Sequence, residues 1–214
     1  MLPLPSRTDL RRRLPQLVVG LFIFGVGVAL QVVSELGLSP WEILHQGLSE
    51  ITGIPLGTVG ILVGMLVLLL WIPLKERFGI GTVLNVMIIG LVIDLSLWRL
   101  PEHLDNLAIR SVVLVTGITL VGFGSGMYIG AGLGPGPRDG LMTGLAKRGI
   151  NIGVARFGIE ISVMVVGWML GGTLGIGTAL FALGMGPLIA LFLPLFQLEP
   201  LVAEPADSHW GTIQ

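Results

Sequence analysis

Ionisable residues inside apolar segments are the first candidates for chemistry in this sequence, because a charge in such surroundings is costly. Arg156 and Glu160 stand four residues apart in one apolar segment, so on a helix they share a face and can pair. Glu160 is the stronger candidate for a ligand contact, since Arg156 is close enough to the segment's end to extend towards water. The alternative is an ion pair that only stabilises the helix. Asp94, in another apolar segment, is expected to pair with Arg99 or Arg110.

Two short segments carry the other candidates. The first, Ser39-Pro40-Trp41-Glu42, is typical of a helix start, with a capping serine, a proline at the first helical position and an acid that completes a capping box. The second, Gly136-Pro137-Arg138-Asp139, repeats this pattern after a glycine-rich approach. A helix N-terminus carries free N–H donors and partial positive charge, which suits an anionic group. The candidate substrate-binding residues are Arg138, Asp139, Glu160, Arg156, Glu42 and Trp41, and the candidate caps or hinges are Ser39, Pro40, Gly134, Gly136 and Pro137.

The composition indicates that membrane helices position these residues. Of the 214 residues 53% are hydrophobic and only 12% are charged, and the mean hydropathy is +0.92. Soluble domains carry about 25% charged residues. Segments that reach the roughly 20 residues needed to cross the hydrocarbon core are Leu14–Val33, Leu56–Leu74, Gly79–Trp98, Ser111–Gly130, Ile152–Leu170 and Gly175–Leu193. We therefore predict an all-α polytopic membrane protein with six transmembrane helices and a retained, uncleaved first helix.

The two short segments, Ser39–Ile51 and Gly136–Arg148, are too short to span a bilayer and allow two interpretations. They can be re-entrant helices whose N-termini point inward, as the glycine- and proline-rich approach favours, because irregular backbone at membrane depth must be buried or face water. They can instead lie flat on the membrane surface as amphipathic helices, as the charges along both segments favour. The sequence leaves both open.

The chain also contains an internal duplication. A shift of 97 residues places Gly20, Gly25 and Gly27 on Gly117, Gly122 and Gly124, and Pro40 on Pro137. After one residue is dropped, Gly79-Ile80-Gly81-Thr82 falls on Gly175-Ile176-Gly177-Thr178. Each half has three spans, so the halves are expected to have inverted topology. With both termini in the cytoplasm, ten of the 12 Lys and Arg residues lie on the inner side, as cytoplasmic loops prefer.

Other classes of protein have no support in the sequence. There is no cysteine, so thiolate metal sites and cysteine nucleophiles are excluded. His45 has no second histidine nearby, and the glycine-rich stretch around residue 134 lacks the lysine of a phosphate-binding loop. With a net charge of −1, nothing points to nucleic acid. We predict no enzyme activity, no cofactor and no metal.

Two groups of residues carry a family resemblance. The sequence Leu133-Gly134-Pro135-Gly136-Pro137-Arg138-Asp139-Gly140-Leu141-Met142 resembles the YczE/YitT family of small bacterial membrane proteins. Leu38-Ser39-Pro40-Trp41-Glu42 and Gly53-Ile54-Pro55-Leu56-Gly57 are similar to its YczE branch. The resemblance runs from about Leu14 to Phe196. It implies a protein of the bacterial cytoplasmic membrane, sometimes treated as a transporter, and supplies no substrate.

Together these patterns predict five parts of the chain. They are a basic cytoplasmic N-terminus (1–13), a first membrane repeat (14–98), an outer connection (99–110), a second membrane repeat (111–196) and a polar cytoplasmic tail (197–214). The predicted function is a permease or channel-like transporter of a small anionic or zwitterionic solute. The alternative is a non-transporting membrane accessory protein, or the substrate-binding subunit of a partner complex. The expected partners are the lipid bilayer and the solute, and the small, glycine-rich chain is compatible with a homo-oligomer.

Overall fold

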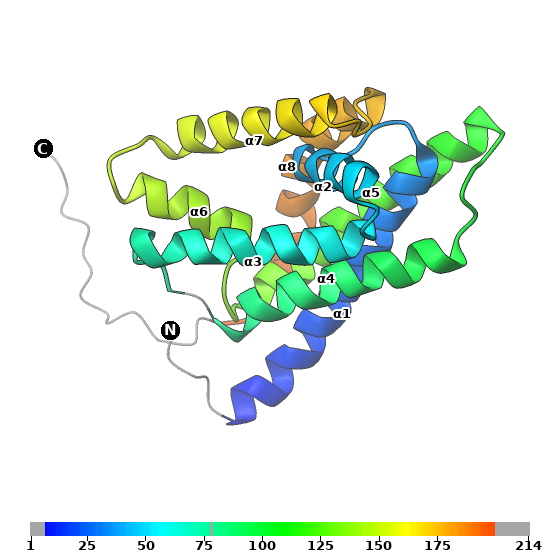
Figure 1. Ribbon diagram of the computed structural model, residues 1–214. Helices are drawn as coiled ribbons and strands as arrows, with labels where there is room; N and C mark the ends of the chain where they lie inside the picture. Colours follow the sequence, from blue (N-terminus) through cyan, green and yellow to red (C-terminus); the bar gives the residue numbers. More distant parts are fainter. Residues whose placement is uncertain (1–6, 78, 200–214) are drawn as a thin grey trace, which may run out of the picture.

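The computed structural model describes residues 7–77 and 79–199, and within them the chain forms eight helices and no strand (Figure 1). The helices are α1 (Arg7–Ser34), α2 (Pro40–Thr52), α3 (Leu56–Leu74), α4 (Ile80–Arg99), α5 (Leu107–Gly130), α6 (Pro137–Ala146), α7 (Ile152–Met169) and α8 (Ile176–Phe196). The order of one long, one short and two long helices occurs twice. Among the described residues, six helices are long and apolar enough to cross a membrane, and α2 and α6 are not among them.

The helix bounds agree with the predicted spans to within a few residues, with two larger differences at helix starts. Helix α1 already begins at Arg7, so the basic segment predicted as a separate N-terminus is helical from that residue onward. Helix α5 begins at Leu107, which shortens the predicted outer connection, because Asn106 caps it with its side chain. Residues 1–6 and residues 200–214 of the predicted tail lie outside the described residues.

Glycines at matching positions of the two halves allow α1 and α5 to cross closely. A Cβ atom added to Gly27 would lie 2.7 Å from the carbonyl oxygen of Gly117. Two helical turns away, a Cβ on Gly124 would lie 2.6 Å from the carbonyl oxygen of Gly20. Lipid provides no hydrophobic driving force between membrane helices, so their association depends on close packing, which small residues permit. Two of the three matched glycine pairs therefore form the contact between the first long helices of the two halves, whereas Gly25 and Gly122 face α4 and α8.

Matching backbone hydrogen bonds and helix contacts also join the two halves. The N–H of Gly81 donates to the carbonyl of Leu133 at 3.0 Å, and the matching N–H of Gly177 donates to that of Leu36 at 2.7 Å. Helix α2 packs against α7 and α6 packs against α3, so each short helix lies on a long helix of the other half. The indole N–H of Trp71 on α3 donates to Pro137 at the start of α6 at 3.0 Å. These crossed contacts fix the two short helices between the halves.

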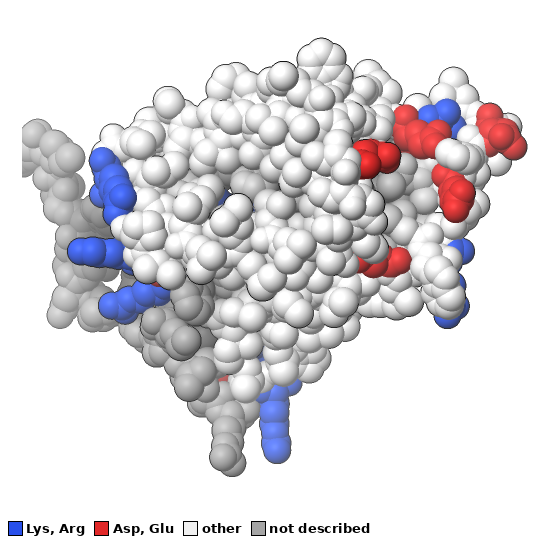
Figure 2. Space-filling view, in the orientation of Figure 1, with Lys and Arg blue, Asp and Glu red and all other residues white. Residues whose placement is uncertain are grey.

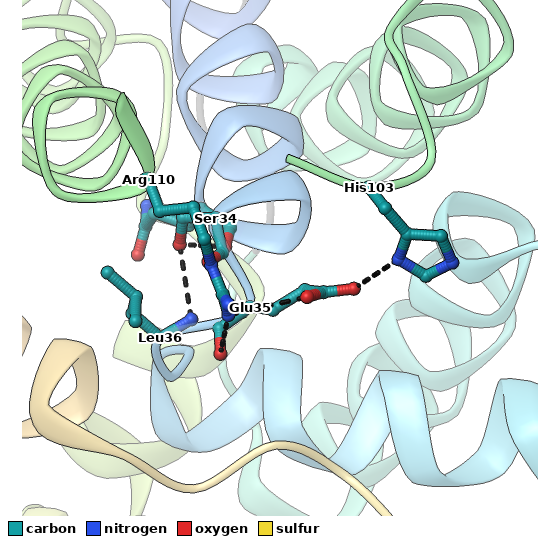
Figure 3. Close-up of polar contacts among 6 residues, drawn as sticks. Ser34, Glu35, Leu36, His103 and Arg110 are labelled. Atoms are coloured by element: carbon teal, nitrogen blue, oxygen red, sulfur yellow. Dashed lines mark hydrogen bonds and ion pairs between the residues drawn. The ribbon is translucent and has the colours of Figure 1, made fainter. Parts of the chain in front are cut away.

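Polar contacts hold the connection between the halves to the end of α1 (Figure 3). Arg110 donates from Nε to the carbonyl of Ser34 at 2.7 Å and from Nη2 to that of Glu35 at 3.0 Å. Its guanidinium therefore satisfies carbonyl groups at the C-terminus of α1, where a cation is also favoured by the helix dipole. The Glu35 carboxylate contacts Arg110 at 3.3 Å and the ring of His103 at 2.7 Å.

The role predicted for Asp94 is wrong. Its carboxylate accepts hydrogen bonds from the backbone N–H of Gly57 at 2.6 Å and from that of Thr58 at 2.8 Å. It caps the N-terminus of α3, which has no side-chain cap of its own. Asp94 forms no ion pair with Arg99 or Arg110, and this intramembrane carboxylate has a structural role.

Candidate functional site

The first turns of the two short helices meet near the middle of the molecule, and from there α2 and α6 run in opposite directions (Figure 1). Ser39 is the N-cap of α2, and its Oγ accepts from the N–H of Glu42 at 3.4 Å. Gly136 takes the same position at the start of α6. A proline follows each cap at the first helical position, as predicted. Both helices therefore direct their N-terminal ends, where the helix dipole is positive, towards the same central region.

Glu42 is the most deeply buried charge of this region, with a side chain only 4% exposed. Its Oε1 accepts from Nη2 of Arg138 at 2.6 Å, and its Oε2 lies 2.8 Å from Nδ1 of His45. Burial alone would raise the pKa of Glu42, but His45 and Arg138 together hold it well below its ordinary value. Glu42 was predicted to complete the capping box of α2, and it pairs across the two halves instead.

Arg138 and Trp41, at matching positions of the duplication, lie against each other. The guanidinium carbon of Arg138 is 5.1 Å from the centroid of the Trp41 ring, a cation–π distance. Trp41 is 6% exposed, and its indole N–H has no hydrogen-bond partner among the described residues. A buried donor without a partner is unfavourable by about 1–3 kcal/mol, so an acceptor that reached this N–H would be stabilised.

Asp139 is close to the single tyrosine of the chain. A Cβ atom on Gly136 would lie 3.2 Å from Oδ2 of Asp139 and 3.3 Å from the hydroxyl of Tyr128, which places both groups at the same spot. Asp139 retains accessible surface where it borders the central region, although protein surrounds it on its other sides. This surrounding protein raises the pKa of Asp139, and Arg138 and Arg156 act in the opposite direction.

Arg156 and Glu160 form the predicted pair on α7, with Nε of Arg156 at 3.1 Å from Oε1 of Glu160. Their side chains are 63% and 33% exposed, so this pair is much more open than that of Glu42 and Arg138. Both residues also line the central cavity, so the pair borders the region where Glu42 and Arg138 meet.

A cavity of about 170 Å³ lies where these groups meet. All six residues predicted to bind substrate line it, together with Ser39, Pro40, Gly136 and Pro137. Its remaining wall is mostly apolar and comes from α3, α4 and α8, through residues that include Val63, Val67, Ile89, Ile93, Phe181 and Met185. A concave, largely apolar site with a few convergent charged groups is the usual form of a small-molecule site.

The sequence interpretation missed three polar residues of the cavity wall, His45, Asn85 and Tyr128. The three-residue spacing of Glu42 and His45 on a short helix was a usable signal for their contact. Gly134, predicted as a hinge, is not among the lining residues. It has a φ of +130°, and a Cβ there would lie 2.8 Å from Oγ1 of Thr82, so it serves the approach to α6. Within residues 7–77 and 79–199, no three His, Asp or Glu side chains are grouped to hold a metal ion.

The six long apolar helices and the central charged cavity define a polytopic, all-α membrane protein. Comparison with known sequences places it more closely. The chain belongs to the YczE-like family of membrane proteins, since residues 11–194 match the profile described as "Family of unknown function (DUF6198)". The family resemblance predicted from the motifs around Pro40 and Pro137 is therefore confirmed.

Three relatives illustrate the family. An uncharacterized protein of Haemophilus influenzae is 40% identical over 185 residues, which cover 86% of this chain and 84% of that protein. The uncharacterized membrane protein YczE of Bacillus subtilis is 35% identical over 178 residues, or 82% of each chain. The uncharacterized protein YyaS of the same organism is 28% identical over 186 residues, covering 84% of this chain and 91% of that protein. No solved structure matches the chain significantly.

Proposed function

We propose that this protein is a permease for a small anionic or zwitterionic solute and that the central cavity is its binding site. The observation that carries the proposal is the cavity itself, since it joins charged groups of both halves at the first turns of the two short helices. Ionisable groups inside a membrane protein usually mark a substrate path. In many transporters the substrate lies where two repeats meet, near the ends of interrupted helices.

We further propose that the halves are repeats of inverted topology, with α2 and α6 as re-entrant helices. The matched residues Trp41 and Arg138 lie against each other, as equivalent positions must near a two-fold axis. The matched hydrogen bonds Gly81–Leu133 and Gly177–Leu36 are related in the same way. An interfacial position for α2 and α6 is less compatible with the burial of Trp41 and Glu42 in the first turn of α2.

The distribution of charge supports an orientation in the bacterial cytoplasmic membrane. Figure 2 shows Lys and Arg side chains at the end of the molecule where α3 ends, and acidic side chains together with some Lys or Arg at the opposite end. Positive residues accumulate on the cytoplasmic side. We therefore place both termini and the end of α6 in the cytoplasm, and the end of α2 outside.

Labelling of single introduced cysteines tests this orientation without background, because the chain has no cysteine of its own. Thr52→Cys and Asp105→Cys should react with a membrane-impermeant maleimide in intact cells. Lys75→Cys and Asn151→Cys should react only after the cells are opened. All four are compared with the unmodified chain. Equal labelling of Thr52→Cys and Asn151→Cys from one side would exclude the inverted arrangement.

Binding is tested by a screen of small metabolites for thermal stabilisation of the purified protein. A ligand at a hundred times its dissociation constant adds about 2.7 kcal/mol, which is readily detected. We expect a ligand that stabilises the wild type and Arg99→Ala but neither Arg138→Ala nor Asp139→Asn, each shift being measured from the variant's own baseline. Arg99 is the matched control, because it also stacks on a tryptophan, Trp98, at 4.5 Å, but is exposed.

Two other outcomes would count against the proposal. A solute that stabilises Arg138→Ala and Asp139→Asn as much as the wild type binds elsewhere, and the cavity assignment is then wrong. If no solute stabilises the wild type and a stoichiometric partner protein co-purifies, the accessory-protein alternative is favoured over the permease.

A further inference from the structure

Two adjacent residues of opposite charge border the cavity with unused hydrogen-bonding capacity. Arg138 donates to Glu42 through Nη2, and its other guanidinium N–H groups have no partner among the described residues. Asp139 accepts hydrogen bonds from the hydroxyl of Tyr128 and the backbone N–H of Gly136, and among the described residues no Lys or Arg nitrogen lies within ion-pair distance of it. Both belong to the first turn of α6. A ligand in the cavity can therefore meet the remaining N–H groups of Arg138 and the carboxylate of Asp139 side by side.

The remaining charges of the cavity are already matched. Glu42 is shared by Arg138 and His45, and Glu160 pairs with Arg156. A purely anionic ligand at Arg138 would stand beside the carboxylate of Asp139, and a purely cationic ligand at Asp139 would stand beside Arg138. Like charges at such a site are unfavourable. A ligand with both charges avoids either repulsion.

Trp41 adds a second, independent indication of where the negative group lies. It lines the cavity, it is nine-tenths buried, and its indole N–H has no hydrogen-bond partner among the described residues. Indole nitrogen is a donor only, so what it lacks is an acceptor. Because the Arg138 guanidinium stacks on the Trp41 ring, a carboxylate that binds Arg138 lies close to the indole N–H.

The rest of the cavity favours an apolar group of limited size. Its apolar lining includes Val63, Ile89 and Met185, from three different helices. The cavity volume is about 170 Å³. For comparison, a wholly apolar cavity of about 150 Å³ accommodates benzene. One branched aliphatic group or one ring therefore fits, and a long acyl chain does not.

From these contacts, and resting on the proposed function, we infer that the solute is a small zwitterion with one apolar group, of the size of a branched-chain amino acid. Its carboxylate binds Arg138 and the indole N–H of Trp41. Its ammonium group binds Asp139. Its apolar group lies against α3, α4 and α8.

Four probes that differ by one group each test this inference by isothermal titration calorimetry. They are free leucine, isocaproate (which lacks the ammonium group), isoamylamine (which lacks the carboxylate) and free glycine (which lacks the apolar group). We expect leucine to bind at least about tenfold more tightly than any other probe, since a hydrogen bond to a charged group, or burial of a branched aliphatic side chain, contributes about that much. Asp139→Asn should remove the advantage of leucine over isocaproate, whereas Asp105→Asn, at an exposed residue outside the cavity, should keep it.

The contrary outcomes separate the inference from the proposed function. If isocaproate binds the wild type as tightly as leucine, the site selects anions, and if isoamylamine does so, it selects cations. Either result overturns the zwitterion while a permease with this cavity stands. If none of the four probes binds, the inference is wrong, and the wider metabolite screen alone decides on the permease.

Discussion

Replacing Glu42 by Gln is expected to lower the melting temperature of the purified protein by roughly 6–20 °C. The substitution leaves the guanidinium of Arg138 and the ring of His45 without their shared carboxylate in a buried position. Removal of one partner from a buried ion pair costs about 3–5 kcal/mol, and each kcal/mol shifts the melting temperature of a protein of this size by about 2–4 °C. The matched control is Glu50→Gln, at an exposed position of the same helix, which should change it little.

The ionisation of Glu42 determines the pH at which this melting temperature should be measured. Because its pKa is lowered in the folded protein, the stabilisation it provides is complete above the ordinary carboxyl pKa and is lost as the pH falls through the folded-state value. At neutral pH the comparison is therefore between an ionised Glu42 and a neutral glutamine. A double variant, Glu42→Gln with Arg138→Gln, should lose less than the sum of the single variants. Strictly additive losses would show that the two side chains do not interact.

Replacing Gly27 by Leu is expected to disrupt the contact between α1 and α5 strongly. Even a Cβ atom there would lie 2.7 Å from the carbonyl oxygen of Gly117, and a backbone carbonyl cannot rotate away as a side chain can. Overpacking of a well-packed core costs about 1–3 kcal/mol, and a leucine against a crossing helix belongs at the upper end of that range. We expect a loss of about 6–12 °C in melting temperature or a failure to purify as a single species.

The matched control for Gly27 is Gly158 on α7, where an added Cβ would meet nothing within 4 Å. Gly158→Leu should leave the melting temperature unchanged or raise it slightly, because leucine favours a helix more than glycine does. If both glycines tolerate leucine equally, α1 and α5 do not cross at Gly27 and Gly117. That outcome would also remove the basis for treating the two halves as packed around one central cavity.

The sequence predicted the helices well because the bilayer constrains them so strongly. A span needs about 20 apolar residues, and six such segments could be located without any knowledge of packing. The two short helices were predictable from the serine, proline and glycine residues at their starts. The first helix was predicted to begin at Leu14 and begins at Arg7, because its basic first turns lack the apolar signal on which that prediction relied.

The candidate site was predictable in its residues and not in its contacts. Trp41, Glu42, Arg138 and Asp139 could be singled out because the duplication places them at equivalent helix starts. The ion pair between Glu42 and Arg138 joins residues 96 positions apart, and no local pattern specifies which side chains meet across two halves. Local rules instead assigned Glu42 to its own helix cap.

The prediction for Asp94 was wrong for a related reason. Its predicted partners, Arg99 and Arg110, were chosen by closeness in the sequence and by charge. Its actual partners are the backbone N–H groups of Gly57 and Thr58, at the start of α3. The free N–H groups and positive dipole of an uncapped helix N-terminus attract a carboxylate, as the charge of an arginine does. Which carboxylate caps α3 can be recognised only once α3 and α4 are packed together.

Solute uptake by purified protein in sealed vesicles tests the central claim most directly, namely that the cavity between α2 and α6 is the binding site of a permease. Uptake of radiolabelled leucine and of the strongest ligand from the metabolite screen would be followed with wild type, Asp139→Asn and Asp105→Asn. We predict saturable uptake by the wild type and Asp105→Asn, and a reduction of about tenfold or more in Asp139→Asn. Uptake at the wild-type rate by a correctly folded Asp139→Asn, or no uptake of a ligand that binds, would contradict the account.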